Sequence, residues 1–260
     1  MKNMLKIASI AAVSFFVAVS CTQTEPEWDR LYNEENLDQW VQLNGEANYY
    51  EEDGTIIGET VLNTPNSFLC TKEQYGDFIL KVDFKVDDGL NSGIQIRSNS
   101  IPEYKDNRVH GYQVEIDPSD RAWSAGVYDE ARRGWLYNLE DNPEAREAFK
   151  NEEWNTYRIE ALGDTIQTWI NGVPAANLVD NMTSEGFIGL QVHGIGDDEE
   201  KEGLQVRWRN FRILTGDKAR ANNKSMDIPQ KTNLFNQLTE EEKEEGWELL
   251  FNGENYEGWR

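Results

Sequence analysis

Acid–base chemistry is the reaction type that the polar side chains of this sequence could carry. Gln113-Val114-Glu115 sets an amide and a carboxyl two residues apart, and His193 supplies an imidazole. A carboxyl and an imidazole can each take up and release a proton when their surroundings adjust their pKa values. The sequence has no Gly-rich phosphate loop and no Gly-x-Ser-x-Gly elbow, so phosphoryl transfer and serine esterase chemistry have no supporting motif.

Metal ligation has weaker support from residue spacing. His110 and His193 each stand in a Val-His-Gly triplet, and neither has a second histidine at His-x-His spacing. The acidic run at 197–200 lacks the spacing of an EF-hand loop and predicts a solvated loop. The sequence therefore identifies no cofactor with certainty and leaves a divalent metal open.

The elements that must position these side chains are short β-strands. Apolar and polar residues alternate in several runs, which is the period of a strand with one buried face. If the apolar residues face a core, their polar neighbours share the opposite face. If these outer faces belonged to one curved sheet, they would form a polar cleft suited to a sugar; the alternative is an ordinary solvated strand face. The outward residues are Gln95 and Arg97; Gln113, Glu115 and Asp117; Gln167 and Trp169; and Gln191 and His193.

The order of the runs predicts an all-β protein. Strand-like runs fill residues 28–215, with turn signals such as Asp53-Gly54, Gly163-Asp164 and Asn171-Gly172 between them. The sequence does not show the alternation of strands with helices that is typical of a parallel sheet. We expect an antiparallel β-sandwich of jelly-roll type, with one short helix over 142–150.

Charge and aromatic content narrow the class of ligand. The chain has 48 Asp and Glu against 25 Lys and Arg, a formal net charge of −23. It lacks the basic stripe that a nucleic-acid partner requires, and its charge disfavours electrostatic docking on anionic lipid. Nine Trp, ten Tyr and ten Phe supply flat apolar rings of the kind that stack on sugars.

Residues 1–20 are predicted to be a bacterial lipoprotein signal peptide. Lys2 and Lys6 precede an apolar run over 7–19 that is too short to span a bilayer comfortably. Small residues then precede Cys21, where such a signal is cut and the thiol lipidated; an ordinary secretion signal is the alternative. We expect an exported protein held at a cell-envelope membrane only by the lipid on Cys21, with 21–27 as a tether. Cys70 is expected to pack as a small hydrophobe.

The end of the sequence repeats its first structured residues. Residues 247–259 align with 28–40 at an offset of 219, and six of the thirteen positions are identical. An offset this long indicates a tandem domain rather than a solenoid. We therefore expect a domain over 28–215, a linker over 216–246 and the start of a second copy at 247–260. Thr239 and Glu242 form a capping-box pattern that predicts a short acidic helix within the linker.

Short motifs occur in a specific order along the strand region. In this order they resemble the 3-keto-disaccharide hydrolase family, whose domains are also described as 3-keto-glycoside 1,2-lyases and 3-keto-2-hydroxy-glucal hydratases. The resemblance covers Trp28 to Leu214 and implies a concanavalin-like or laminin-G-like jelly roll. The motifs are Leu31-Tyr32-Asn33, Asn66-Ser67-Phe68-Leu69, Tyr75-Gly76-Asp77-Phe78, Asn91-Ser92-Gly93-Ile94, His110-Gly111-Tyr112-Gln113-Val114-Glu115, Trp154-Asn155-Thr156-Tyr157, Trp169-Ile170-Asn171-Gly172 and Gly189-Leu190-Gln191-Val192-His193-Gly194.

This resemblance implies cleavage of a glycoside already oxidised at C3 by a separate glycoside 3-dehydrogenase. A C3 ketone acidifies the C2 proton, so a base can remove it, the C1 substituent can leave, and water can add to the glucal. By motif position, Glu115 and His193 are the candidate proton-transfer groups. The family commonly reads Glu-x-Gln where this chain has Gln113-Val114-Glu115, which leaves the identity of the base open. The substrate contacts implied are Asn91, Arg97, Gln113, Asp117, Tyr128, Trp169 and Gln191.

Two other functions stay open at this level. The segment from Glu115 to Asp120 looks like the Glu-x-Asp-x-x-Glu strand of laminarinase-type retaining glycoside hydrolases, with Glu115 as the leading acid. Its last acid is Asp120 rather than Glu, and Pro118 interrupts the strand. A non-catalytic carbohydrate-binding module of laminin-G type would use the same fold.

Overall fold

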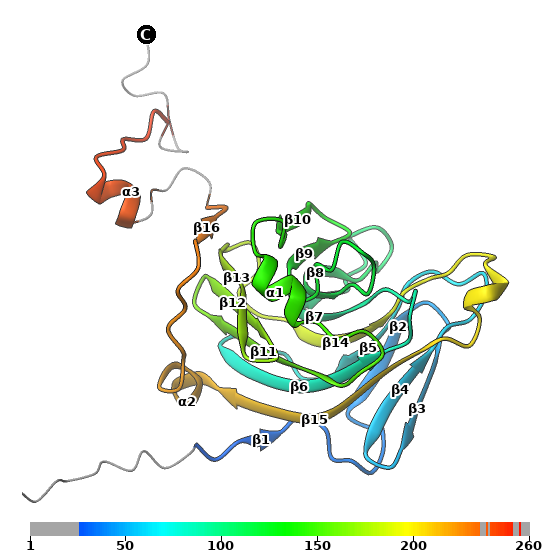
Figure 1. The fold of residues 1–260 in the computed structure, drawn as a ribbon. Helices are drawn as coiled ribbons and strands as arrows, with labels where there is room; N and C mark the ends of the chain where they lie inside the picture. Colours follow the sequence, from blue (N-terminus) through cyan, green and yellow to red (C-terminus); the bar gives the residue numbers. More distant parts are fainter. Residues whose placement is uncertain (1–25, 235–237, 239, 252–254, 256–260) are drawn as a thin grey trace, which may run out of the picture.

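Two β-sheets packed face to face form the protein. The computed structural model describes residues 26–234, 238, 240–251 and 255. Figure 1 shows the long strands of one sheet running beneath those of the other. This is the antiparallel β-sandwich that the alternation predicts. The predicted signal peptide, Cys21 and the tether up to residue 25 lie outside the described residues, as do 252–254 and 256–260.

The first sheet has nine strands within the described part of the chain. Its neighbouring strands are antiparallel, except that β16 runs parallel to β13. In spatial order the strands are β16 (Lys231–Thr232), β13 (Val173–Val179), β12 (Thr165–Ile170), β11 (Asn155–Leu162), β6 (Phe78–Val86), β15 (Gln205–Thr215), β4 (Thr55–Glu59) and β3 (Asn48–Glu52), with β1 (Asp29–Arg30) also paired to β15.

The second sheet has seven antiparallel strands and carries the polar outer face that matters for function. Strands β8, β7 and β14 lie side by side near its centre. In spatial order the strands are β10 (Gly134–Tyr137), β9 (Val127–Glu130), β8 (His110–Ile116), β7 (Ser92–Asn99), β14 (Phe187–Val192), β5 (Ser67–Thr71) and β2 (Trp40–Asn44).

The residues predicted to face inward form the core between the two sheets. This includes the apolar positions of β7, β8 and β14, all of which are buried in one cluster: Ile94, Ile96, Tyr112, Val114, Ile116, Ile188, Leu190 and Val192. On β5 the pattern is reversed, because Phe68 and Cys70 face the outer side and pack with Val109 and Phe187. Cys70 thus packs as a small hydrophobe, and burial raises the pKa of its thiol.

Turns and helices follow the local sequence signals. Asn171 and Gly172 have φ angles of 50° and 86°, the left-handed pair that a tight hairpin requires, and they join β12 to β13. Helix α1 (Pro143–Ala148) lies within the predicted range, and the Asn142 side chain caps it by accepting from Ala145 N at 3.1 Å. The remaining helices are α2 (Gly216–Arg220), α3 (Glu240–Glu244) and a 3₁₀ turn at Glu199–Lys201.

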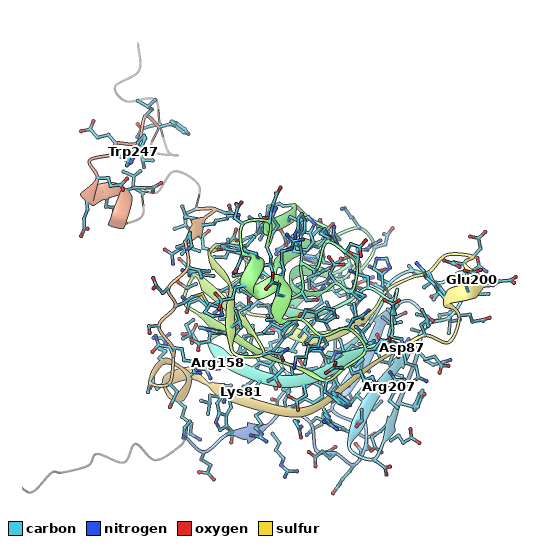
Figure 2. The ribbon with its side chains drawn as sticks, viewed as in Figure 1. Lys81, Asp87, Arg158, Glu200, Arg207 and Trp247 are labelled. Carbon is cyan, nitrogen blue, oxygen red and sulfur yellow. The ribbon has the colours of Figure 1, made fainter. Side chains whose placement is uncertain are left out.

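The chain after β15 packs against the nine-stranded sheet over residues 216–232, although its polarity predicts a linker. Ala219 of α2 is buried against Ile79 and Leu214. Further on, the carbonyl of Asn222 accepts a 2.8 Å hydrogen bond from Arg158, which lies on the outer side of β11 (Figure 2). Ile228 also packs against the core, and β16 pairs with β13, so contacts along the whole segment join it to the sheet.

The connection between β14 and β15 projects from one end of the sandwich. It carries the acidic run at 197–200, and Figure 2 shows Glu200 near its tip. This placement agrees with a solvated loop. No helix in the described part of the chain is long and apolar enough to cross a membrane.

Candidate functional site

A polar cavity of about 380 Å³ lies on the outer face of the seven-stranded sheet. Its side chains come from β8, β9, β10, β14 and the connections around them. The cavity brings together six of the nine site residues predicted from the sequence. It is lined by Asn66, Asn91, Arg108, Gln113, Glu115, Arg121, Tyr128, Glu130, Trp135, Gln191 and His193.

Glu115 is the titratable group at the centre of this site. Its residue is only 5 % exposed, and each carboxylate oxygen accepts one amide hydrogen bond of 2.7 Å. Asn91 Nδ2 donates to Oε1, and Gln113 Nε2 donates to Oε2. Burial raises the pKa of Glu115 to about 7, against the opposing effect of these two donors. A carboxyl with this pKa can accept or donate a proton near neutral pH.

Gln191 has a buried side-chain amide that pairs with nothing in the described part of the chain. The residue lines the cavity from β14 and has no exposed surface, and neither its Nε2 nor its Oε1 has a hydrogen-bond partner there. Burying an amide without partners destabilises a folded protein by about 1–3 kcal/mol. A ligand with an adjacent donor and acceptor would satisfy both ends of this amide.

His193 lies where β14 ends, on the exposed side of the cavity. Its Nδ1 lies 2.8 Å from the carbonyl oxygen of Gly194, which favours a proton on Nδ1. The Nε2 atom is then available to a ligand. His110 differs, because it is buried, its Nδ1 contacts the carbonyl of Arg108, and its ring packs on Tyr104.

An aromatic group forms one side of the cavity. The Trp135 ring lies edge-on to Tyr128 at 5.3 Å and to Trp123 at 4.9 Å. The Arg121 guanidinium packs over both indoles, at 4.7 Å from Trp123 and 5.1 Å from Trp135. Burial raises the pKa of the Tyr128 hydroxyl, so it stays a hydrogen-bond donor at neutral pH. Aromatic faces of this kind stack on the apolar faces of sugar rings.

Asp117 supports the site from behind rather than lining it. Burial opposes its ionisation, but hydrogen bonds from Ser119, Arg121 and the backbone of Trp123 lower its pKa. The bond from Arg121 Nε to Asp117 Oδ2 is 2.7 Å long. Asp117 therefore orients Arg121, and its oxygens point into this turn rather than into the cavity, where a sugar contact was predicted.

Arg97, also predicted to contact the sugar, does not line the cavity. The side chain is buried and donates to the carbonyls of Gly76 and Gly163 and to Asp77, at 2.7–3.1 Å. Arg97 has a φ of 45° and sits where the register of β7 against β8 shifts. This bulge breaks the alternation from which its position was predicted.

Trp169 lies on the wrong sheet to reach the cavity. It belongs to β12 in the nine-stranded sheet, where it is buried and the Arg158 guanidinium lies 5.8 Å from its ring. Its outward direction was predicted from the alternation, but alternation does not tell which sheet a strand joins. Trp169, predicted to stack on the sugar, therefore does not line the cavity.

Five cavity residues were missed by sequence reasoning: Asn66, Arg108, Arg121, Glu130 and Trp135. Asn66 opens one of the quoted motifs and could have been found there. Arg108 ends the long β7–β8 connection and pairs with Glu130 at 3.3 Å. Neither Arg108 nor Trp135 belongs to an alternating run, so no local pattern marks them.

The donor set does not fit a divalent metal. Among the described residues, no group of three or more His, Cys, Asp or Glu side chains is placed to hold a metal ion. Both oxygens of Glu115 face amide donors, and Glu130 faces the Arg108 guanidinium.

Solved structures share this fold at low sequence identity. A candidate glycosyl hydrolase from Parabacteroides distasonis is 18 % identical, with 73 % of this chain and 94 % of that chain covered and a TM-score of 0.52. A Bacillus subtilis protein of unknown function with a galectin-like fold is 13 % identical, with coverage of 73 % and 98 % and a TM-score of 0.53. These likenesses describe the fold alone.

Comparison with protein families assigns the chain more specifically. No match was found among curated proteins. Residues 27–214, which include both sheets' long strands and all the cavity residues, match one family over more than half of the chain. This family supports a carbohydrate-active function. The chain belongs to the family of 3-keto-alpha-glucoside-1,2-lyase-like domains.

Proposed function

We propose that this domain cleaves 3-keto-glycosides, with Glu115 as the group that moves the C2 proton. The observation that carries the proposal is a buried carboxyl with a pKa raised to about 7, held by two amides on the floor of a polar cavity. A base needs such a pKa to remove a proton from carbon next to a ketone at neutral pH. Family membership supports the substrate class.

The reaction balances without a covalent intermediate on the protein. Glu115 takes the C2 proton, and the electron pair moves toward the C3 ketone oxygen, where charge develops. The C1–oxygen bond then breaks, a double bond forms between C1 and C2, and the leaving oxygen takes a proton from an acid. Water next adds its oxygen to C1 and a proton returns to C2, so the sum is hydrolysis.

Four other cavity residues suit the remaining roles. The unpartnered Gln191 amide can donate to the oxygen that gains charge, because its Nε2 has no competing acceptor among the described residues. His193 lies on the exposed side, where an aglycone would leave. With its Nδ1–H directed at the Gly194 carbonyl, it can protonate the departing oxygen from Nε2 when the ring carries both protons. Trp135 and Tyr128 offer the ring faces for sugar stacking.

A retaining glycoside hydrolase mechanism has less support from the geometry. Such enzymes need two carboxyl groups about 5–5.5 Å apart across the bond that is cleaved. Asp117 is bound within its own turn, Asp120 is exposed outside the cavity, and Glu130 pairs with Arg108. Glu115 is therefore left without a free carboxyl partner among the cavity residues.

The biological setting remains part of the proposal. A 3-keto-glycoside must come from an oxidation at C3, so we place a glycoside 3-dehydrogenase upstream. The lipid on Cys21 would hold the exported domain at the cell-envelope membrane, where glycosides are met before uptake. We expect no nucleic-acid partner, because the sequence lacks a basic stripe.

A chromogenic 3-keto-glucoside and its unoxidised parent distinguish the three functions. We expect the chain from Thr22 onward to release the chromophore from the keto-sugar alone, and Glu115→Gln to lose that release. Release from the parent sugar would indicate a conventional glycosidase. Binding that survives Glu115→Gln and His193→Ala, with no release by the parent protein, would indicate a binding module. Parallel reactions with EDTA report on a metal.

A further inference from the structure

Behind the cavity, a chain of three polar side chains leads to Glu115. Gln113 Oε1 accepts a 2.5 Å hydrogen bond from Gln95 Nε2, and Gln95 Oε1 accepts a 2.7 Å bond from the Ser98 hydroxyl. Gln95 and Gln113 are direct partners in the register of β7 against β8. Gln95 and Ser98 have no exposed surface and do not line the cavity.

The direction of this chain determines which end of Gln113 faces Glu115. A side-chain amide has one acceptor end and one donor end. The closest acceptor to the Ser98 hydroxyl is Gln95 Oε1, and the backbone carbonyls of Ile96 and Tyr112 lie farther away at 3.1 and 3.3 Å. Once the oxygen of Gln95 faces Ser98, its NH₂ must face Gln113. The NH₂ of Gln113 then faces Glu115 at 2.7 Å.

Glycines leave the space that these side chains occupy. A Cβ at Gly93 would lie 2.5 Å from Cδ of Gln113, and one at Gly111 would lie 2.3 Å from the Ser98 hydroxyl oxygen. A Cβ at Gly189 would lie 3.3 Å from Cβ of Gln95. Each of the three side chains thus lies against the backbone of one glycine, which leaves it little room to turn on that side.

We propose that Gln95 and Ser98 are positioning residues that set the proton affinity of Glu115 through the orientation of Gln113. An ordered N–H donor stabilises a carboxylate more than it stabilises the neutral acid. Loss of either positioning residue lets the Gln113 amide rotate, so the charged form of Glu115 loses a fixed donor. Its midpoint of titration then rises.

Replacing Gln95 or Ser98 leaves the charged and titratable groups around Glu115 unchanged. Asp117 and Arg121 act on it from the turn after β8, and Tyr128 faces it from β9. Tyr157 of β11 also interacts with it, and its hydroxyl donates to the backbone carbonyl of Glu115. Arg108, Glu130 and His193 line the same cavity. Because Gln95 and Ser98 are neutral, replacing them alters the orientation of a dipole and leaves these charges in place.

The test is a ¹³C NMR titration of the full chain labelled at glutamate carboxyls. The resonance absent from Glu115→Gln identifies Glu115. We expect Gln95→Leu and Ser98→Ala each to raise its midpoint, by about one pH unit for the loss of one ordered donor. Because Ser98 acts through Gln95, the double variant should titrate like Gln95→Leu alone.

Thr60→Val is the matched control, since it removes a buried hydroxyl that donates to the Lys201 carbonyl away from the cavity. It should leave the Glu115 midpoint unchanged. The proposal is overturned if both single variants titrate like the parent, if their shifts add in the double variant, or if Thr60→Val shifts the midpoint equally. If Gln95→Leu does not fold, the Ser98→Ala midpoint decides alone.

The consequence for catalysis rests on the proposed function, whereas the titration does not. With a 3-keto-glucoside as substrate, the pH at which the rate of Ser98→Ala rises should increase by the same amount as the Glu115 midpoint. If the midpoint shifts but neither the parent nor any variant turns over the substrate, the proposed function is wrong and the positioning role stands. If the substrate is turned over but the midpoint does not shift, the positioning role is wrong and the proposed function stands.

Discussion

Asn91 and Glu115 are joined across two strands by a 2.7 Å hydrogen bond from the Asn91 amide to Oε1 of the carboxylate. Asn91 lies just before β7, and Glu115 lies near the end of β8, so antiparallel pairing brings them together. The other carboxylate oxygen is held by Gln113. Glu115 therefore keeps one orientation toward the cavity although burial favours its neutral form.

Replacing Glu115 by Gln should remove turnover while the fold persists. The amide has the same shape as the carboxyl but cannot take the C2 proton, and general-base catalysis contributes roughly 10²–10⁴-fold. The check is the initial rate of chromophore release from a 3-keto-glucoside, with circular dichroism as the control for folding. A variant that keeps more than a tenth of the parent rate would exclude Glu115 as the base.

Activity should rise with pH through about pH 7, because Glu115 must be ionised to act as the base. Asn91→Ala removes one donor to the carboxylate, so the rise should move to higher pH. The measurement is kcat/KM against pH for both proteins. A profile of Asn91→Ala that overlays that of the parent would contradict this role for the amide.

Glu115 should also make the fold less stable as pH rises from 5 to 7. Its pKa of about 7 in the folded protein exceeds the ordinary value of 4.5 that a glutamate has in an unfolded chain, so the native state binds the proton more tightly. This contribution to the free energy of unfolding is fully present below about pH 4.5 and is lost as the pH rises to about 7. It amounts to at most about 3 kcal/mol. Urea denaturation across this range should show a smaller pH dependence in Glu115→Gln than in the parent.

Gln191→Leu should both raise the stability of the protein and lower its turnover. The substitution removes a buried amide that has no partner among the described residues, so the free energy of unfolding should rise by about 1 kcal/mol. Turnover should fall because a donor to the substrate is lost. Gln113→Leu is the contrast, since its amide is paired at both ends and its loss should lower Tm. Calorimetry and kcat/KM together separate the two effects; a lower Tm in Gln191→Leu would count against the idea.

Trp135→Ala should weaken substrate binding roughly tenfold, the effect of losing about 1–1.5 kcal/mol of ring contact. KM for a keto-glucoside is the measurement. Trp169→Phe provides the control, because this ring is buried in β12 of the other sheet. Equal increases of KM in both variants would contradict a contact between the Trp135 ring and the sugar.

Arg97→Met should destabilise the fold by about 3 kcal/mol, because it leaves two carbonyls and Asp77 without the buried guanidinium. Turnover per folded molecule should stay at the parent value. The two measurements are urea denaturation and kcat/KM at low temperature. A stable variant with a raised KM would restore Arg97 to the sugar site.

The faces of the central strands could be predicted from the sequence because alternation is a local property of an extended chain. Successive side chains point to opposite sides, so apolar Val114 implies that Gln113 and Glu115 face outward. The same reasoning places Gln191 on the outer face of β14. Asn142 and the Asn171-Gly172 turn were also readable, because capping and left-handed backbone depend on a few neighbouring residues.

Which strands become neighbours was decided only by the tertiary structure. Alternation treats Trp169 and Gln191 alike, but long-range pairing puts β12 and β14 in different sheets. A bulge at Arg97 turns one outward position into a buried anchor, and the connections around the sheet bring in Arg108 and Trp135. The raised pKa of Glu115 also depends on the tertiary structure, because its main cause is burial, which removes the water that would stabilise the charged form.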